Sequence, residues 1–183
     1  AIKIYNIRDF TKDKHNTADD KPYGGGPGMV LKAEPIVKAV EKIKSGKKNA
    51  KVILFAADGK QFTNAYAKKL SKSYKDIILI AGHYEGVDER VVKILKAEKV
   101  SVGPFILTGG ELPAMILIDA VSRQIKGVLG KHESLEETRE ASSEVYTRPE
   151  TIVYKKKQYK VPTVLLSGNH KKIEEWRKNR KNK

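Results

Sequence analysis

Residues 1–124 alternate between short apolar runs and longer stretches with helical spacing. Apolar runs over 51–55, 76–81 and 100–102 predict strands, and residues 2–7 alternate apolar with polar side chains, which is also typical of a strand. Between them, residues 35–43, 62–70, 88–96 and 111–124 place apolar side chains on one helical face. This order predicts an α/β fold with a mainly parallel sheet and helices on both faces.

Local signals set the expected limits of these helices. Pro35 and Pro113 suit the first turn of a helix, Ser45-Gly46 ends the first one, and Asp88 is placed to cap the third. Residues 56–59 have the composition of a turn. In the last of these helices we expect four side chains to point inward: Ile116, Leu117, Ala120 and Val121.

Three regions are polar. Residues 8–30 predict a long loop, and such loops are usually functional or disordered. Residues 127–149 have the composition of a linker. The remaining segment is a small tail with a Lys-rich turn near 154–159 and a final helix that begins near Asn169, with Ile173 and Trp176 on one side.

Composition narrows the class of protein. The 183 residues suit one domain, or one domain with a small appendage. No apolar run is long enough to span a membrane, so we expect no membrane partner. The chain has no cysteine, which excludes disulfides and thiolate metal sites and favours a cytoplasmic location.

The formal net charge of +15 is concentrated in the tail. Residues 151–183 hold eleven Lys or Arg against two Glu, which gives +9. Such a segment indicates a polyanionic partner, most simply nucleic acid. A Lys-rich solubilising surface is the alternative.

Two glycine-bearing loops follow apolar runs, at 82–90 and 103–111. Because open α/β sheets bind ligands beyond the carboxyl ends of their strands, these loops predict a small-molecule pocket. Neither has the spacing of a dinucleotide fingerprint or a P-loop. Taken alone, Gly109-Gly110 is also compatible with a plain turn before a helix.

A third glycine-rich segment, Pro22-Tyr23-Gly24-Gly25-Gly26-Pro27-Gly28-Met29, permits backbone angles that other residues avoid and close approach by another chain or ligand. The flanking Pro and Tyr favour a shaped loop over a floppy one.

These segments, taken in order, resemble the bacterial tRNA (guanine-N1)-methyltransferases, the TrmD family. The resemblance rests on Asn6-Ile7-Arg8-Asp9-Phe10-Thr11, residues 18–20 and 22–29, Gly82-His83-Tyr84-Glu85-Gly86-Val87-Asp88-Glu89-Arg90, residues 107–114, 118–123 and 127–130, Tyr146-Thr147-Arg148-Pro149-Glu150, and Leu165-Leu166-Ser167-Gly168-Asn169-His170.

The resemblance implies a deep trefoil-knotted fold of the SPOUT class, with S-adenosylmethionine bound in the knot. It also implies an antiparallel homodimer whose active site lies between subunits. The implied reaction is methylation of N1 of the guanine just 3′ to the anticodon of tRNA. The implied domains are a knotted methyltransferase domain at 1–126, a linker or lid at 127–149, and an abridged basic tRNA-binding segment at 150–183.

The resemblance also assigns residues. The donor pocket would be lined by Leu54, Phe55, Ala56, Ala57, Gly82, Tyr84, Glu85, Ser101, Val102, Gly103, Phe105, Ile106, Leu107, Gly109, Gly110 and Pro113. The tRNA would be contacted by Asp19, Gly25, Gly26, Pro27, Gly28, Ser167, Asn169, His170 and Arg177.

The chemistry requires a base for the N1 proton and a cation for charge developing on O6. Arg123, at the end of an otherwise apolar helix, is our candidate cation; a helix C-terminal charge that interacts with the dipole is the alternative. The family places an Asp in the linker where this chain has Thr138. Glu137 is the nearest carboxylate and our candidate base, while Glu136 and Glu140 stay open.

Two further expectations concern a metal cofactor and the length of the chain relative to the family. The four histidines lack metal-ligand spacing, so Mg²⁺, which supports turnover in some family members, would rely on substrate or water. The chain looks abridged at both ends relative to the family. A donor-binding RNA module with weak or no catalysis, and a knotted methyltransferase for another RNA position, are the alternative functions.

Overall fold

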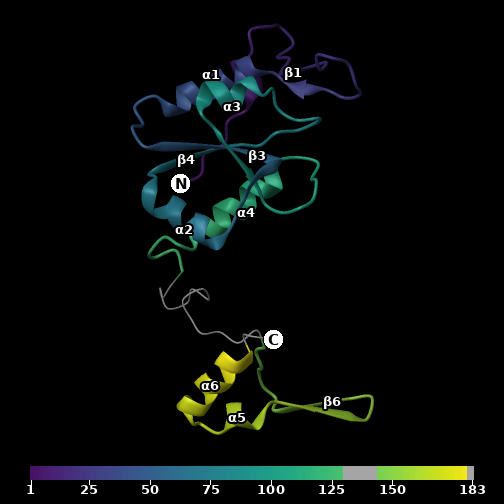
Figure 1. Cartoon of the computed structure of the whole chain (residues 1–183), viewed down its shortest axis with the longest axis vertical. Coiled ribbons are helices and arrows are strands. Elements are labelled where there is room, and N and C mark those ends of the chain that lie inside the picture. Colours follow the sequence, from purple (N-terminus) through teal and green to yellow (C-terminus); the bar gives the residue numbers. More distant parts are fainter. Residues whose placement is uncertain (130–143, 181–183) are drawn as a thin grey trace. The chain divides into compact units, whose positions relative to one another are not determined.

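The computed structural model describes residues 1–129 and 144–180 of the chain. The chain divides into two compact units, residues 1–128 and 129–183 (Figure 1).

The first unit is built on a three-stranded parallel sheet in the order β4-β3-β5. The strands are β3 (Ala50–Gln61), β4 (Asp76–Ile80) and β5 (Glu98–Ser101). In the register, Val52 lies opposite Ile78 and Phe55 lies opposite Val100. The carboxyl ends of all three strands therefore meet at one edge of the sheet, as the sequence predicts.

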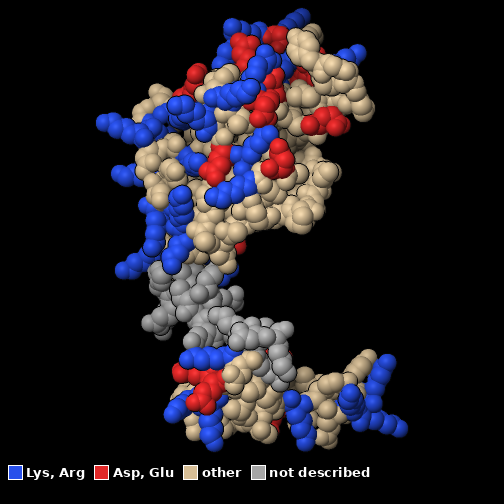
Figure 2. All heavy atoms as spheres, in the orientation of Figure 1, with Lys and Arg blue, Asp and Glu red and all other residues tan. Residues whose placement is uncertain are grey.

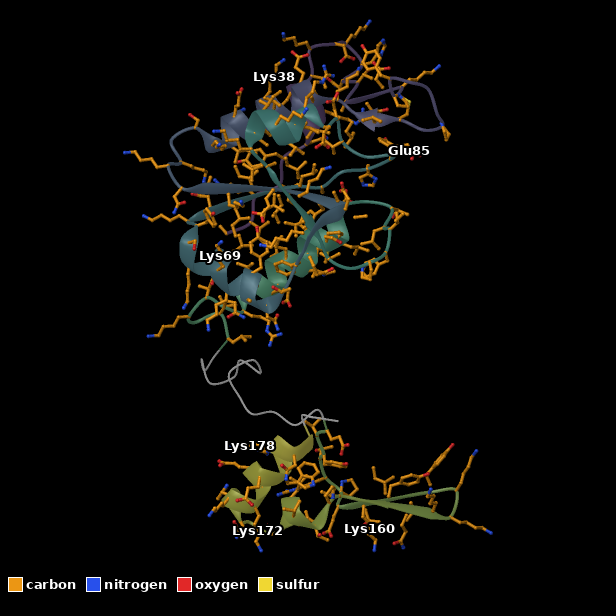
Figure 3. The ribbon with its side chains drawn as sticks, viewed as in Figure 1. Lys38, Lys69, Glu85, Lys160, Lys172 and Lys178 are labelled. Carbon is orange, nitrogen blue, oxygen red and sulfur yellow. The ribbon has the colours of Figure 1, made fainter. Side chains whose placement is uncertain are left out.

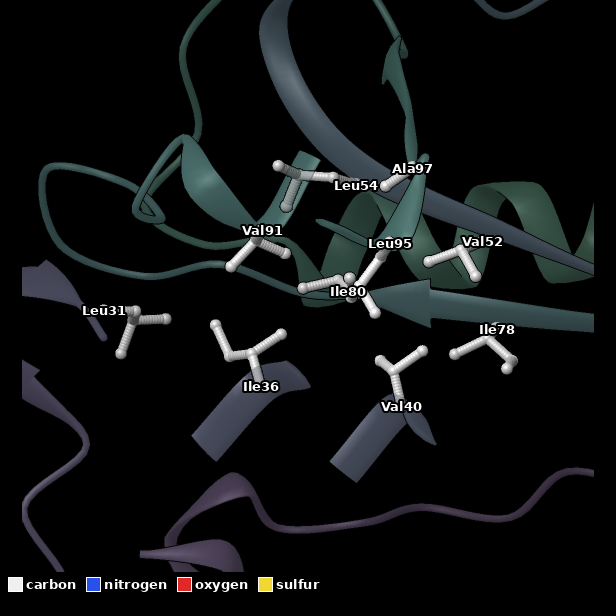
Figure 4. Packing of buried hydrophobic residues seen from close by; sticks show 10 residues of the cluster. All are labelled: Leu31, Ile36, Val40, Val52, Leu54, Ile78, Ile80, Val91, Leu95 and Ala97. Atoms are coloured by element: carbon white, nitrogen blue, oxygen red, sulfur yellow. The ribbon is translucent and has the colours of Figure 1, made fainter. Parts of the chain in front are cut away.

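Helices cover both faces of this sheet (Figure 1). Successive side chains of a strand point to opposite faces, so Val52 and Leu54 pack with α1 (Ala33–Lys44) and α3 (Arg90–Leu95), as Figure 4 shows. Ile53 packs with α2 (Asn64–Ser73) and α4 (Glu111–Ser122) on the other side. The α/β architecture expected from the sequence is confirmed.

The helix ends follow local sequence signals. Thr63 Oγ1 accepts the Tyr66 N–H at 3.2 Å and starts α2, one residue after Phe62, whose ring packs edge-on against Tyr66. Asp88 Oδ1 accepts the Arg90 N–H at 2.9 Å, so its side chain bonds the first residue of α3, although the N-cap residue is Glu89. The side-chain hydrogen bond with Arg90 and its charge keep the pKa of Asp88 below its usual value.

Three local predictions are wrong. Residues 2–7 form no strand; a short 3-10 helix η1 occupies Ile7–Phe10, and Ile4 is 93% exposed. An alternating pattern makes a strand only where a neighbouring strand pairs with it, and no described strand pairs with this segment. Residues 2–7 therefore show that alternation alone is not sufficient.

Residues 56–59 are not a turn but part of β3. The register shifts there, so that Phe55 and Lys60 both lie opposite Val100. A Cβ on Gly59 would lie 2.5 Å from the Val100 backbone nitrogen, so only glycine allows the bulged strand to approach β5 this closely.

The third correction concerns α4, where Ile116 is 46% exposed. Pro113, Leu117 and Val121 are buried and recur at intervals of four residues, which places Ile116 on the flank of the inward stripe.

The remaining elements are two short strands of the first unit and the hairpin and helices of the basic C-terminal unit. β1 (Asp19–Asp20) pairs antiparallel with β2 (Val30–Leu31) inside the predicted long loop. The C-terminal unit contains the antiparallel hairpin of β6 (Thr151–Tyr154) and β7 (Lys157–Lys160), followed by α5 (Thr163–Leu166) and α6 (His170–Arg180). The final helix is confirmed, whereas the sequence predicted only the turn of the hairpin.

Across the part of the chain that the structure describes, we find no helix long and apolar enough to cross a membrane.

Candidate functional site

A cavity of about 480 Å³ lies at the carboxyl ends of β3, β4 and β5. It is bounded by the bulged end of β3 and by the two loops that follow β4 and β5. All sixteen residues predicted for the donor pocket line it. Eight residues outside that set also line it, five of them within the two loops predicted to form the pocket: Asp58, His83, Gly86, Val87, Glu89, Lys99, Val100 and Thr108.

The two loops are joined to each other at Gly82 and Gly110. The Gly110 N–H donates to the Gly82 carbonyl at 2.8 Å, and an isolated antiparallel bridge pairs His83 with Gly109. A Cβ on Gly110 would lie 2.6 Å from Ala81 Cα. The glycine pair therefore does more than form a turn, because it lets the start of α4 lie against the end of β4.

A buried serine shapes the loop after β5. Ser101 Oγ donates to the Gly103 carbonyl at 2.9 Å and accepts the Gly103 N–H at 3.3 Å. This arrangement closes a tight turn directly after the strand. The chain then passes through Phe105, Ile106 and Leu107, whose side chains are exposed at the rim of the cavity.

Charged side chains form one part of the wall. Lys99 Nζ lies 2.9 Å from Glu89 Oε2 and 3.2 Å from Asp58 Oδ2. Hydrogen bonds to Glu89 and then to Asp58 raise the pKa of Lys99. The cluster is partly exposed, and its carboxylates give this side of the cavity an acidic character.

The glycine-rich loop lies beside Glu85, which Figure 3 labels. The Glu85 N–H donates to the Met29 carbonyl at 3.0 Å, and a Cβ on Gly28 would lie 2.5 Å from Glu85 Cγ. Gly28 has a φ of +80°, and Gly24, Gly25 and Gly26 also have positive φ. These contacts at Gly28 favour the interpretation of a shaped loop next to the cavity.

Asp19, a predicted RNA contact, is in β1 and accepts from Arg8 Nη2 at 3.3 Å. Gly25, Gly26 and Pro27 belong to the same loop as Gly28, and a Cβ on Gly25 or Gly26 would meet no described atom. There is therefore open space beside Gly25 and Gly26.

The candidate catalytic residues do not line the cavity. Arg123 follows α4 at its C-terminal end, whereas Gly110 precedes the helix at its N-terminal end. Twelve helical residues span about 18 Å, so Arg123 and the cavity lie at opposite ends of one helix. Within residues 1–129 and 144–180, no hydrogen bond or ion pair engages the Arg123 side chain. Glu137, Glu136, Glu140 and Thr138 lie outside the described residues.

The predicted C-terminal RNA contacts build a turn before α6. Ser167 Oγ donates to the Val164 carbonyl at 2.7 Å and accepts the Asn169 N–H at 3.2 Å. Asn169 Oδ1 accepts the Lys172 N–H at 3.2 Å and caps α6, which begins at His170. Arg177 lines a separate cavity of about 1020 Å³ within the C-terminal unit.

Taken together, the fold and the cavity define an α/β protein with a small-molecule site at the carboxyl ends of a parallel sheet. Comparison with known sequences is more specific: the chain belongs to the family described as tRNA (Guanine-1)-methyltransferase TrmD, whose model matches residues 1–183.

Curated relatives agree with this assignment. A tRNA (guanine-N(1)-)-methyltransferase of Carboxydothermus hydrogenoformans is 50% identical over 182 residues, which cover 97% of this chain and 69% of the relative. The protein of the same name from Dictyoglomus turgidum is 50% identical over 184 residues, covering 97% and 71%. That of Clostridioides difficile is 46% identical over 183 residues, covering 97% and 77%.

Proposed function

We propose that the chain transfers a methyl group from S-adenosylmethionine to N1 of the guanine just 3′ to the anticodon of tRNA, guanine-37. The observation that carries this proposal is the single cavity that gathers all sixteen predicted donor-site residues from three strand ends. Because the chain belongs to this family, tRNA is the most direct choice of substrate.

The residues of the cavity fit such a donor. Leu54, Val102 and Phe105 offer apolar surface for an adenine ring, and the glycines leave main-chain N–H and C=O groups open to its polar edges. Glu85 and Glu89 supply negative charge, which complements a sulfonium. When bound, the donor supplies an electrophilic methyl group on sulfur.

The residues of the chain then have two tasks at the guanine. The Glu137 carboxylate would take the proton from N1, which leaves the electron pair of nitrogen free to form the new bond. The Arg123 guanidinium would donate to O6 and stabilise the negative charge that develops there.

The position of Arg123 leads us to propose a homodimer. Within one chain, Arg123 is about one helix length from the cavity, so a second antiparallel copy is needed to bring this guanidinium to the site. The exposed side of α4 supports a partner, because apolar side chains are solvent-exposed there: Leu112, Met115 and Ile116, followed by Ile125.

The remaining assignments are also proposals. Residues 1–126 would bind the donor in a trefoil knot, with residues 127–149 as the linker or lid. The contact between Gly82 and Gly110 supports a close interleaving of the two knot loops. Residues 150–183 would bind tRNA in the cytoplasm.

We assign no catalytic step to a metal. Within residues 1–129 and 144–180, no group of three or more His, Asp or Glu side chains is arranged to hold a metal ion. Any Mg²⁺ that supports turnover would bind through tRNA phosphates and water.

Thr138 at the expected position of the base favours one alternative function, a donor-binding RNA module without catalysis. Radiolabelled methyl transfer to unmodified tRNA decides between the two. Transfer to a substrate with guanine at the target nucleotide, and none to its adenine counterpart, supports the enzyme. Donor binding by calorimetry without transfer supports the alternative, and label at another nucleotide would indicate a different RNA position.

A further inference from the structure

The β6–β7 hairpin of the C-terminal unit has a surface of a single charge sign. Between Thr151 and Lys160 it contains four lysines and no acidic residue. Every residue of the two strands except Thr151 is exposed, and Figure 2 shows Lys and Arg side chains gathered along the hairpin. In α6, by contrast, Glu174 and Glu175 interrupt the positive charge.

The turn of the hairpin holds lysines in a conformation that side chains disfavour. Tyr154 pairs with Lys157, which leaves Lys155 and Lys156 as the two turn residues, with φ of 49° and 62°. Asn-Gly is the sequence that this kind of turn normally selects. Residues held in sparsely populated backbone regions are concentrated at functional sites, and here the turn places adjacent ammonium groups at the tip.

One face of the hairpin combines tyrosine rings with cations. Ile152 pairs with Tyr159 and Tyr154 pairs with Lys157, so these four side chains share a face. Tyr154 and Tyr159 are 59% and 50% exposed. Lys155 Nζ lies 5.5 Å from the Tyr154 ring centroid, and Lys157 Nζ lies 5.4 Å from that of Tyr159.

Exposed aromatic rings next to lysines are typical of surfaces that bind RNA. The lysines neutralise phosphates, and the rings offer stacking surface to unpaired bases. We propose that the β6–β7 hairpin contacts the tRNA substrate, with Lys155, Lys156 and Lys157 on its phosphate backbone. This inference rests on the proposed function, and within residues 150–183 it names the particular side chains that would contact the RNA.

The test variant combines Lys155→Asn, Lys156→Gly and Lys157→Gln. It removes three charges and gives the turn its preferred sequence, so the hairpin is expected to persist. The matched control combines Lys68→Gln, Lys69→Gln and Lys72→Gln on the exposed side of α2, which changes the net charge equally; Figure 3 labels Lys69.

We expect the hairpin variant to bind unmodified tRNA at least about tenfold more weakly at ~0.1 M salt. The plot of log affinity against log salt concentration should become shallower by about one for each lost phosphate contact. Donor affinity should stay unchanged, and replacing the three lysines by arginine should retain tRNA binding.

Unchanged tRNA affinity in the hairpin variant, or an equal loss in the α2 control, would overturn the inference. The proposed function is tested separately. A wild-type protein that binds tRNA but transfers no methyl group would reject the methyltransferase activity. If its tRNA affinity still depends on the hairpin lysines, the contact between hairpin and tRNA is supported all the same.

Discussion

His83 Nε2 donates to Glu111 Oε1 at 2.7 Å and connects the loop after β4 to the first turn of α4. His83 lines the cavity, and Glu111 directly follows Gly110, which also lines it. The pair therefore joins both sides of the site in addition to the hydrogen bond between Gly110 and Gly82.

We predict that His83→Ala and Glu111→Ala each weaken donor binding by at most about fivefold, because the pair is half exposed and such pairs contribute about 1 kcal/mol or less. Calorimetry on both single variants and the double variant measures the coupling. If the pair acts as a unit, the double variant loses no more than either single one. Fully additive losses would reject the connection.

Gly110→Ala is expected to damage the donor site more than either of those changes. Its Cβ would lie 2.6 Å from Ala81 Cα, so α4 must move away from the end of β4. We expect donor affinity to fall at least about tenfold and the melting temperature to fall by several degrees. Lys69→Ala, at an exposed position on α2, is the control and should change neither quantity.

Arg123→Ala should reduce kcat by about a hundredfold or more while donor binding is retained, because loss of one donor to a developing oxyanion has an effect of this size. Lys126→Ala, three residues further along and exposed, is the charge-matched control. Steady-state kinetics with saturating tRNA gives the answer, and normal turnover in Arg123→Ala would reject the assignment.

Substitutions of the linker glutamates identify the base. We predict that Glu137→Gln lowers kcat by about a hundredfold or more, in the range of general-base contributions, and that Glu136→Gln and Glu140→Gln have little effect. The pH profile of kcat/KM should lose its acidic limb in the same variant. Full activity of Glu137→Gln together with loss in either neighbour would move the role to that neighbour.

Ile116→Glu should leave the protein folded but monomeric. Ile116 is half exposed in the single chain, so a carboxylate is tolerated there, whereas burial against a second copy would leave it unpaired. Sedimentation equilibrium measures the mass, and methyl transfer should disappear with the dimer. A wild-type protein that sediments as a monomer would contradict the proposed interface.

The sequence predicted a small-molecule pocket at the two glycine-bearing loops because these signals are local, whereas the sixteen lining residues were assigned from the family resemblance. Glycines directly after apolar runs place Gly82 and Gly103 at strand ends, and parallel strands bring such ends together. The ion-paired part of the wall was not predicted, since Asp58 and Lys99 lie outside the two loops and no motif connects them with Glu89.

Two other differences have equally specific causes. The hairpin was missed because Lys155-Lys156 lacks the usual turn signature, so only a Lys-rich turn was predicted there. The strand at 2–7 was predicted wrongly because a sequence pattern does not show whether a neighbouring strand pairs with it.

Strand β3 contributes to both cores of the N-terminal unit. Val52 and Leu54 belong to one layer, and Ile53, the residue between them, belongs to the other. If either layer unfolds, β3 is therefore also lost from the packing of the other layer. Residues 1–128 should behave as one cooperative folding unit, so that a destabilising change beneath α1 also lowers the population of molecules with an intact cavity at the carboxyl ends of the strands.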